Sequence, residues 1–395
     1  MIVIVLNRRY APLRSRPADA AGVTSFVRSL IAAAKVANLP VAMILFDRDE
    51  AGWRERGSED CDLHDCPAVL LPFSFTADRE IIAARFDAAL KRFGCGQIHI
   101  YAQSGVYAPY LPDRAAVFTH HGPFVDEVEK ALGAWEAVRA YDGGEEKITA
   151  LRRSQQEGLR ELKAKPAFLS LEISPIQVQS LLRADVPRSR VRFLMPTAPY
   201  LPEAEPLPES AERWLADRSE TRLFTACARI DSFKNLSEIV EACKVLESGG
   251  KQASAFIAAG GAPDADRYRD HVRGAGLQRS SIYVSARLRP GQLNSLFTRA
   301  AAWAPFVFPS KYETLGMTPL QAKYHGCSVL CRDDRAHVGV ANFLKSHELY
   351  QNGPVGLASS LAAWRPETCQ GPRSTPTIGG QDHFHEILRS VVEWR

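Results

Sequence analysis

The sequence predicts an α/β protein of two domains, and three observations support this fold class. Short apolar runs alternate with amphipathic segments of helical period, which is the pattern of parallel sheets covered by helices. The chain has 395 residues, a length that suggests two or more domains. Residues 200–210 are dense in proline and glutamate, as in many linkers, and the alternation begins again after them.

The bulk composition indicates a soluble globular protein. The formal net charge of +4 is mild for this length and argues against a protein that holds nucleic acid by bulk electrostatics, whereas a local basic groove for an anionic ligand stays open. The opening apolar run is too short for a signal peptide, no run reaches membrane-spanning length, and the eight cysteines show no disulfide framework. We therefore expect a cytoplasmic protein with no transmembrane segment and no nucleic-acid partner, while the oligomeric state stays open.

In the first half, unbroken apolar runs predict buried parallel strands, and segments with apolar residues on one face predict helices. We expect strands at residues 2–6, 41–46, 97–101, 116–119, 168–171 and 190–195. We expect helices at residues 21–40, 79–92 and 126–165, the last broken at Gly143 and Gly144, and one more helix after its capping residue Ser174. Residues 53–77 are predicted to be irregular.

The second half repeats this rhythm and predicts a second domain. We expect strands at residues 223–227, 255–259, 282–284, 304–308 and 328–331. We expect helices at residues 236–247, 292–300, 318–325, 357–364 and 383–394, and the pattern of residues 338–350 is ambiguous.

The most informative stretch is residues 308–330, where a strand, a polar loop, a glycine turn and a helix follow one another. A glycine turn that opens a helix leaves backbone N–H groups unpaired, and such groups bind phosphate. Here these donors lie near Leu315, Gly316 and Met317. Glu313 precedes the turn and Gln321 follows it, so both can reach groups beside a bound phosphate. A diphosphate flanked by two hydroxylated sugars would use all of these elements.

This stretch resembles the signature of retaining glycosyltransferases of the GT-B fold, the glycosyltransferase family 4-like proteins or glycosyl transferases group 1. The family pattern reads PSxxEGFGLxxLEAMAxGxPV, and eight positions match it: Pro309, Ser310, Glu313, Gly316, Leu320, Ala322, Gly326 and Val329. Gln321 departs, because the family has there a second glutamate that accepts hydrogen bonds from the ribose hydroxyls. An amide oxygen accepts without charge assistance, which costs roughly 1 kcal/mol per bond.

The resemblance extends to two loops of the second half. After the strand 223–227, Arg229 and Lys234 match two cations that in the family grip the donor diphosphate, although basic loop residues can also simply be solvated. Ala286 and Arg287 follow the strand 282–284, where the family packs the nucleobase.

Two features of the first half also match. Thr119, His121 and Gly122 fit a strand-end pattern whose histidine contacts the donor sugar, with a capping or solvated histidine as the alternative. Gly22 corresponds to part of a glycine-rich loop that faces the donor diphosphate, or is a plain turn glycine. Pro196 and Thr197 stand where the family usually has proline, asparagine and glycine.

The resemblance implies a GT-B fold, with two Rossmann-like domains facing across a cleft. The acceptor-binding domain would span residues 1–197, with a helix at 381–395 packing back on it, and the nucleotide-sugar-binding domain residues 198–380. The implied reaction moves a sugar, with retention at the anomeric carbon, from a nucleotide-diphosphate sugar to an unidentified glycan or small-molecule acceptor, and needs neither a metal nor a cofactor.

The implied site residues fall into three groups that share some members. They are His121, Glu313, Arg229 and Lys234 for catalysis; Gly22, Arg229, Lys234, Leu315, Gly316 and Met317 for the donor diphosphate; and Ala286, Arg287 and Gln321 for the nucleoside. Acceptor contacts are expected from residues 53–77 and 104–112.

The sequence leaves some alternatives to a glycosyltransferase open and argues against others. A phosphorylase or sugar-nucleotide hydrolase of the same fold stays open, as does a non-catalytic protein, which Gln321 and the reduced glycine loop at Gly22 favour and the intact Glu313 argues against. No G-x-G-x-x-G follows the first strand, which argues against an NAD-dependent dehydrogenase. The acidic pairs Asp47–Asp49 and Asp264–Asp266, and the CDLHDC segment around His64, are not expected to bind metal.

Overall fold

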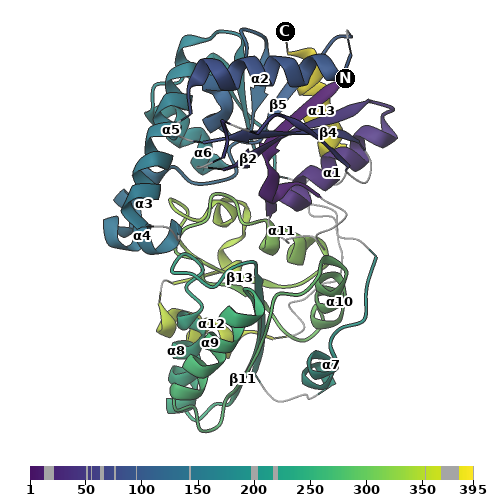
Figure 1. Cartoon of the computed structure of the whole chain (residues 1–395). Coiled ribbons are helices and arrows are strands. Elements are labelled where there is room, and N and C mark those ends of the chain that lie inside the picture. Colours follow the sequence, from purple (N-terminus) through teal and green to yellow (C-terminus); the bar gives the residue numbers. More distant parts are fainter. Residues whose placement is uncertain are drawn as a thin grey trace. The chain divides into compact units, whose positions relative to one another are not determined.

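The chain forms two compact units in the computed structural model shown in Figure 1. The first unit is Met1–Tyr200 together with Gly379–Arg395, and the second is Leu201–Ile378. The structure describes residues 1–12, 22–49, 52–54, 56–62, 66–74, 77–94, 96–141, 144–196, 203–216, 221–351, 353–365 and 382–394. Several features of the sequence prediction lie outside these ranges. They are the domain boundary between residues 197 and 198, the first residues of the linker, Thr197 and His64.

The first unit is built on an eight-stranded sheet in the order β3-β4-β2-β1-β5-β6-β7-β8. Its central strand β1 pairs in parallel with β2 and β5, so that Ile4 lies beside Met43 and Tyr101. Only β3 is antiparallel, to β4. The strands are β1 Ile2–Asn7, β2 Val41–Arg48, β3 Glu59–Asp62, β4 Pro67–Phe73, β5 His99–Ala102, β6 Ala116–Phe118, β7 Phe168–Glu172 and β8 Val191–Phe193.

Helices cover both faces of this sheet. On one face, residues of α2, α5, α6 and the 3-10 segment η2 complete the core. On the other, α1 packs against α13, whose Phe384 ring lies 5.3 Å from that of Phe26. The helices are α1 Gly22–Val36, α2 Arg79–Arg92, α3 Val125–Leu132, α4 Ala134–Tyr141, α5 Gly144–Ala164, α6 Pro175–Arg183 and α13 Asp382–Glu393, with short 3-10 segments η1 Arg8–Tyr10, η2 Gly105–Tyr110 and η3 Arg188–Arg190.

The prediction that residues 53–77 are irregular was wrong, because β3 and β4 lie within them. Pro72 made a strand there look unfavourable, since proline removes a ladder hydrogen bond. In the structure β3 pairs with β4 only as far as Leu70, so Pro72 lies beyond the part of β4 that is flanked on both sides.

The long helical segment at residues 126–165 divides differently from the prediction. Gly133, at φ +88°, ends α3, and α4 begins at the next residue. A residue at this φ is strained unless it is glycine, so the backbone can turn here cheaply. Residues 142 and 143 lie outside the described ranges, and Gly144 begins α5.

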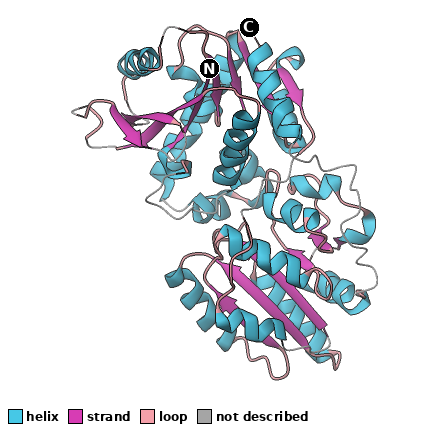
Figure 2. Ribbon diagram, turned by 90° about the vertical axis from the view of Figure 1, so that its right-hand side faces the viewer, coloured by secondary structure: helices cyan, strands magenta, loops and turns pink. Residues whose placement is uncertain are grey.

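The second unit is a six-stranded sheet in the order β11-β10-β9-β12-β13-β14, and all of its pairings are parallel. Figure 2 shows helices flanking this sheet. The strands are β9 Thr221–Cys227, β10 Ala253–Ala259, β11 Ser281–Ser285, β12 Phe306–Phe308, β13 Val329–Arg332 and β14 Leu349–Tyr350. The helices are α7 Glu209–Ala216, α8 Ser237–Ser248, α9 Ala262–Gly274, α10 Pro290–Ala300, α11 Met317–Tyr324 and α12 Pro354–Ala363, with 3-10 segments η4 Gly339–Phe343 and η5 Ser346–Glu348.

The strand order of the second unit predicts where a ligand binds. The order of the strands reverses between β9 and β12, which lie side by side in the middle of the sheet. In open α/β sheets, ligands bind outside the carboxyl ends of the strands at such a reversal. The two loops that leave the sheet there are residues 228–236, after β9, and residues 309–316, after β12.

Candidate active site

The loops that follow β9 and β12 are joined directly. The backbone N–H of Lys311 donates to the carbonyl of Phe233 at 2.8 Å, and the rings of Phe233 and Tyr312 lie 6.0 Å apart. Because Phe233 and Tyr312 are both buried, this contact holds the two loops as one packed surface.

An ion pair between Lys234 and Glu313 lies at the centre of this surface. The ammonium of Lys234 donates to Oε2 of Glu313, and the two side chains keep 15% and 23% of their surface exposed. Burial lowers the pKa of Lys234, but the carboxylates of Glu313 and Asp231 outweigh it and leave the pKa raised. Lys234 is therefore charged at neutral pH and still open enough to meet a ligand. The sequence proposed both residues, and the structure brings them together.

Arg229 belongs to the same loop but is more exposed. Its guanidinium lies 3.2 Å from Oδ2 of Asp231, and half of its side chain is open to solvent. Asp231 was missed in the sequence analysis, although an aspartate between two predicted site cations was a visible signal. Its other oxygen, Oδ1, accepts the backbone N–H of Lys234 at 3.0 Å, so Asp231 holds the loop that carries both cations.

The glycine turn after β12 has the geometry that the sequence predicted. Gly316 has φ +91° and precedes the first residue of α11, Met317. A Cβ at Gly316 would approach Val340, Pro319 and Phe308 to 3.1–3.3 Å, so the position requires glycine for both space and conformation. The N–H groups at the beginning of α11 have no acceptor within the helix and carry the positive end of its dipole.

The backbone of Glu313 is fixed by a second segment. Its N–H donates to the carbonyl of His337 at 2.8 Å, and its carbonyl accepts from Gly339 at 2.9 Å. A Cβ at Gly339 would lie only 1.9 Å from the carbonyl oxygen of Thr314, so the two segments approach as closely as glycine permits. Val338 and Gly339 begin the stretch 338–350 whose pattern was ambiguous in the sequence, and the structure places this beginning, with His337, as a support for Glu313.

The predicted nucleoside residues occupy two places. Gln321 lies in α11 with only 5% of its surface exposed. Ala286 and Arg287 follow β11, the edge strand, which β10 separates from β9. There the N–H of Arg287 donates to the carbonyl of Gly260 at 3.0 Å, which ties the end of β11 to the end of β10.

Two buried hydroxyl groups, one in the loop after β9 and one in the loop after β12, lack a hydrogen-bond partner in the part of the chain that the structure describes. Oγ of Ser232 and Oγ of Ser310 make no hydrogen bond to the described residues. Most buried polar atoms in proteins are hydrogen-bonded to protein or water.

In the first unit, His121 lies at the carboxyl edge of the sheet. One of its ring nitrogens, Nε2, is 2.8 Å from Oε1 of Gln103, which follows β5, and the ring packs edge-on against Phe26 at 4.8 Å. Burial, together with the neighbouring His120, lowers the pKa of His121 to about 3. The ring is therefore neutral at physiological pH and can act as a hydrogen-bonding group, while it carries no charge.

His120 is a buried residue with a fixed partner. Its Nδ1 lies 2.6 Å from Oε1 of Glu172, and its backbone N–H donates to the other carboxylate oxygen at 3.2 Å. Glu172 was missed in the sequence, where it directly follows the predicted strand 168–171. A Cβ at Gly105 would lie 2.4 Å from Nε2 of His120, so η2 begins directly against this ring. His120 thus orders the strand ends beside His121.

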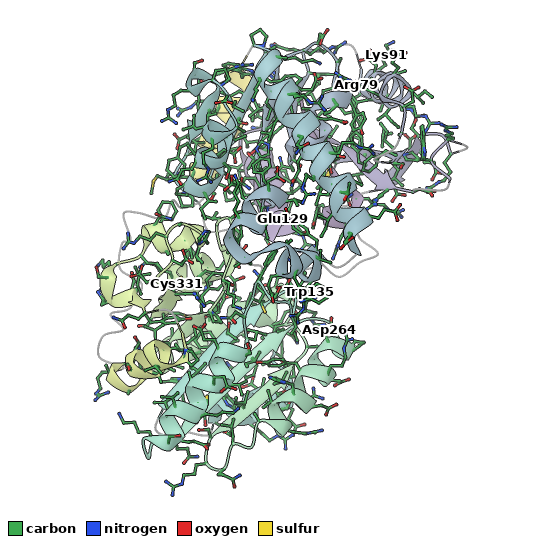
Figure 3. The ribbon with its side chains drawn as sticks, turned by 90° about the vertical axis from the view of Figure 1, so that its left-hand side faces the viewer. Arg79, Lys91, Glu129, Trp135, Asp264 and Cys331 are labelled. Atoms are coloured by element: carbon green, nitrogen blue, oxygen red, sulfur yellow. The ribbon has the colours of Figure 1, made fainter. Side chains whose placement is uncertain are left out.

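Other predicted positions contribute less. Gly22 is the first residue of α1, and the preceding residues 13–21 lie outside the described ranges. Asp47 and Asp49 pair with Arg56, and Figure 3 shows Asp264 on α9, where it pairs with Arg267 one turn later. Within the described ranges, no three His, Cys, Asp or Glu side chains are grouped to hold a metal ion, and no helix is long and apolar enough to cross a membrane.

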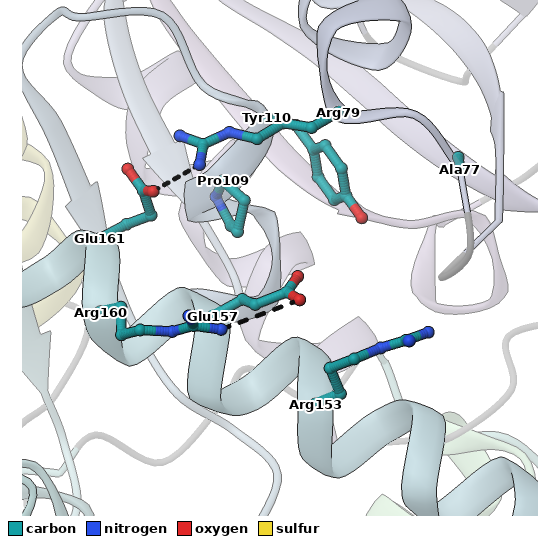
Figure 4. Close-up of a pocket in the computed structure, with 8 residues that line it drawn as sticks. All are labelled: Ala77, Arg79, Pro109, Tyr110, Arg153, Glu157, Arg160 and Glu161. Carbon is teal, nitrogen blue, oxygen red and sulfur yellow. Dashed lines mark ion pairs between the residues drawn. The ribbon is translucent and has the colours of Figure 1, made fainter.

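A cavity of about 490 Å³ lies in the first unit between α2, η2 and α5. Figure 4 shows the side chains of Arg153, Glu157 and Arg160 along α5, across from Arg79 and Tyr110. Arg79 pairs with Glu161 at 2.7 Å, and Arg160 lies 3.9 Å from Glu157. Arg153 has no ion-pair partner among the residues that the structure describes. The remaining lining residues, Ala77 and Pro109, come with Tyr110 from the two stretches expected to contact the acceptor.

Comparison with known proteins finds a family match in the second unit and structural matches over the chain. Residues 211–352 match the family described as glycosyl transferases group 1. This region contains both loops of the second unit, the glycine turn and α11. No curated protein sequence matches the chain.

Solved structures match over the whole length. Sucrose-phosphate synthase from Thermosynechococcus elongatus is 16% identical, with a TM-score of 0.62 over 100% of this chain and 95% of that chain. WaaG, a glycosyltransferase involved in lipopolysaccharide biosynthesis, is 13% identical, with a TM-score of 0.59 over 100% and 96%. Alr3699/HepE of Anabaena, solved with UDP and glucose, is 11% identical, with a TM-score of 0.59 over 99% of each chain. These likenesses confirm the GT-B fold. The match of residues 211–352 to glycosyl transferases group 1 supports a glycosyltransferase.

Proposed function

We propose that the chain transfers a sugar from a nucleotide-diphosphate sugar to a hydroxylated acceptor, with retention at the anomeric carbon and without a metal ion. The observation that carries this proposal is the Lys234–Glu313 pair, which joins the ends of β9 and β12 at the reversal of strand order in the second unit.

The proposed donor site uses charge that is already in place. Cleavage of the bond to the diphosphate develops negative charge on the leaving group. Lys234, Arg229 and the N–H groups around Leu315, Gly316 and Met317 supply positive charge and hydrogen bonds to this group. These groups can stabilise the leaving diphosphate by themselves, which is the reason for proposing a metal-independent reaction.

The ion pair suggests how binding proceeds. In the structure, Glu313 neutralises Lys234. A bound diphosphate would take over Lys234, and the carboxylate of Glu313 would then accept hydrogen bonds from hydroxyl groups of the donor sugar. Glu313 is proposed as an orienting residue and not as a covalent nucleophile. On the nucleoside side, Gln321, Ala286 and Arg287 remain the proposed contacts.

His121 is the residue of the first unit proposed to contact the reacting sugar. Its lowered pKa keeps the imidazole neutral, so it would act as a hydrogen-bond partner for a sugar hydroxyl. Gly22, at the start of α1, remains a proposed contact of the diphosphate.

We also propose that the cavity beside α5 binds part of the acceptor. Its lining offers hydroxyl-binding carboxylates and one cation, Arg153, that forms no ion pair with the described residues. An acceptor with hydroxyl groups and a negative charge would fit this chemistry. Arg153→Ala should raise the KM for such an acceptor about tenfold and leave nucleotide affinity unchanged, and the exposed Arg273→Ala on α9 should change neither. An unchanged acceptor KM in Arg153→Ala would remove the cavity from the acceptor site.

The donor site is tested by calorimetric titration with UDP, GDP, ADP and dTDP, with and without magnesium. We expect one nucleotide to bind saturably without the metal, and Arg229→Ala to abolish or strongly weaken that binding. Arg267→Ala is the matched control, since this exposed arginine also pairs with an aspartate, but on α9. No binding to any nucleotide would overturn the donor-site proposal. Transfer to an acceptor, followed by the anomeric configuration of the product, then separates a retaining transferase from a hydrolase or a non-catalytic protein.

A further inference from the structure

Glu238, in the first turn of α8, is a buried carboxylate with three hydrogen-bond donors. Only 6% of the residue is exposed. Its Oε2 accepts from Nδ2 of Asn235 at 2.6 Å and from Nη1 of Arg332 at 2.8 Å, and its Oε1 accepts from the hydroxyl of Tyr350 at 2.8 Å. A buried carboxylate is costly unless charge and hydrogen bonds compensate it, and here both are present.

The three donors come from different strand ends. Asn235 lies in the loop after β9, Arg332 is the last residue of β13, and Tyr350 is the last residue of β14. The side-chain amide of Asn235 also donates to the carbonyl of Pro309, the first residue after β12, at 3.2 Å. Through these contacts one carboxylate joins the carboxyl ends of four adjacent strands.

The hydrogen bonds of Glu238 and Asn235 lie next to the backbone that carries the Lys234–Glu313 pair. Asn235 directly follows Lys234 and has a φ of +50°, in the left-handed region, which costs most residues energy and which asparagine enters more readily than other non-glycine residues. The hydrogen bonds of its side chain to Glu238 and to Pro309 support this conformation. Pro309 begins the loop that carries Glu313. Glu238 therefore holds, through Asn235, the two backbone segments that carry Lys234 and Glu313.

We propose that Glu238 is a positioning residue, which sets the separation of Lys234 and Glu313 without itself touching the substrate. Its effect on catalysis rests on the proposed function, whereas its effect on the ion pair does not. A merely structural carboxylate would lower stability when removed but would leave the environment of Lys234 unchanged, so the two roles can be separated.

The same helix offers a matched control. Glu247, near the end of α8, accepts the backbone N–H groups of Gln278 at 3.1 Å, Arg279 at 2.9 Å and Ser280. Glu238→Gln and Glu247→Gln each replace a carboxylate that accepts three hydrogen bonds with a neutral amide that keeps one acceptor oxygen. Of the two glutamates, Glu238 is the one that is hydrogen-bonded to Asn235, the residue next to Lys234.

The experiment measures how fast an amine-reactive reagent labels Lys234, by mass spectrometry of the intact, folded protein. Lys244 on α8, an exposed lysine that pairs with Glu241, is the internal reference. We expect the Lys234 to Lys244 labelling ratio to be low in the natural protein, to rise at least fivefold in Glu238→Gln, and to stay unchanged in Glu247→Gln. An unchanged ratio in folded Glu238→Gln, or an equal rise in both variants, would overturn the proposal.

Two further measurements keep the result decisive. If circular dichroism shows that Glu238→Gln does not fold, Tyr350→Phe replaces it, because this variant removes one donor and keeps the carboxylate. A smaller rise of the labelling ratio is then expected, and no rise contradicts the proposal.

Nucleotide titration of the same proteins addresses the catalytic consequence. We expect the nucleotide Kd to increase about tenfold in Glu238→Gln and not in Glu247→Gln. If the natural protein binds no nucleotide, the proposed function fails, while the labelling ratio still decides the role of Glu238.

Discussion

Lys234 and Glu313 form an ion pair although 79 positions separate them in the sequence. The parallel sheet brings them together, because β9 and β12 are neighbours and both loops leave from the same edge. The pair combines a cation suited to a diphosphate with a carboxylate suited to sugar hydroxyls.

Removing either member of the pair should have a different effect. Lys234→Met should weaken nucleotide-diphosphate binding by ten- to a hundredfold, since hydrogen bonds to charged groups contribute about 1.5–3 kcal/mol. Glu313→Gln should keep nucleotide affinity within about threefold and lower kcat at least tenfold, because the proposed partner of Glu313 is the sugar. Titration calorimetry and initial rates measure the two effects. Lys244→Met on α8 serves as the control, and equal losses of affinity in Lys234→Met and Lys244→Met would contradict the assignment.

Gly339→Ala should damage the support of Glu313. An added Cβ would lie 1.9 Å from the carbonyl oxygen of Thr314, so the backbone must move. Overpacking of this kind typically costs about 1–3 kcal/mol, and we expect a lower free energy of unfolding together with weaker activity. Chemical denaturation measures the first quantity. Gly274→Ala, at the end of α9 with no atom within 4 Å of the added Cβ, should leave stability unchanged or slightly higher.

The pH dependence of stability should contain a contribution from His121. Burial and His120 lower its pKa to about 3 in the folded protein, against about 6.5 in an unfolded chain. The folded state then binds fewer protons, so the contribution of His121 is fully present above pH 6.5 and is lost as the pH falls from 6.5 toward 3. We expect the difference in Tm between the natural protein and His121→Gln to shrink or reverse between pH 7.5 and pH 4.5. A constant difference would show that His121 titrates normally.

Gln321→Glu restores the residue that the resembled family has at this position. A charged acceptor should strengthen hydrogen bonds from ribose hydroxyls by roughly 1 kcal/mol each, so nucleotide affinity should rise about fivefold. The position is buried, so the new charge should also lower the stability of the nucleotide-free protein. Thermal melts with and without nucleotide measure both changes. No gain in affinity would argue against a ribose contact from α11.

Much of the fold followed from local pattern. The runs of β1 and β10 are buried along nearly their whole length, and such strands can be recognised in a sequence because most of their positions are apolar. The strand β4 was missed, because its prolines argued against a strand, and only the limited length of β3 explains why Pro72 is tolerated. The helix α9 was not predicted, and its acidic residues Asp264 and Asp266 pair with Arg267 and Arg269 one turn later.

The candidate site divides in the same way. Glu313, Gly316, Arg229 and Lys234 could be selected from the sequence, because the strand–loop–helix order and the resemblance assign chemistry to local spacing. Asp231 could have been selected as well, because it lies between two predicted site cations. Glu172 and Glu238 could not, since a carboxylate at a strand end or in a first helical turn is ordinary until its partners are known.

The sequence by itself determined the alternation of strands and helices and the set of polar groups that end the strands of the second unit. The tertiary structure decided which of these groups meet. Strand order places β9 beside β12 and so pairs Lys234 with Glu313, and the same order gathers Asn235, Arg332 and Tyr350 around Glu238. The physical reason is that local spacing governs the energy of a helix or strand, whereas a buried charge is stable only where distant parts of the chain supply its partners.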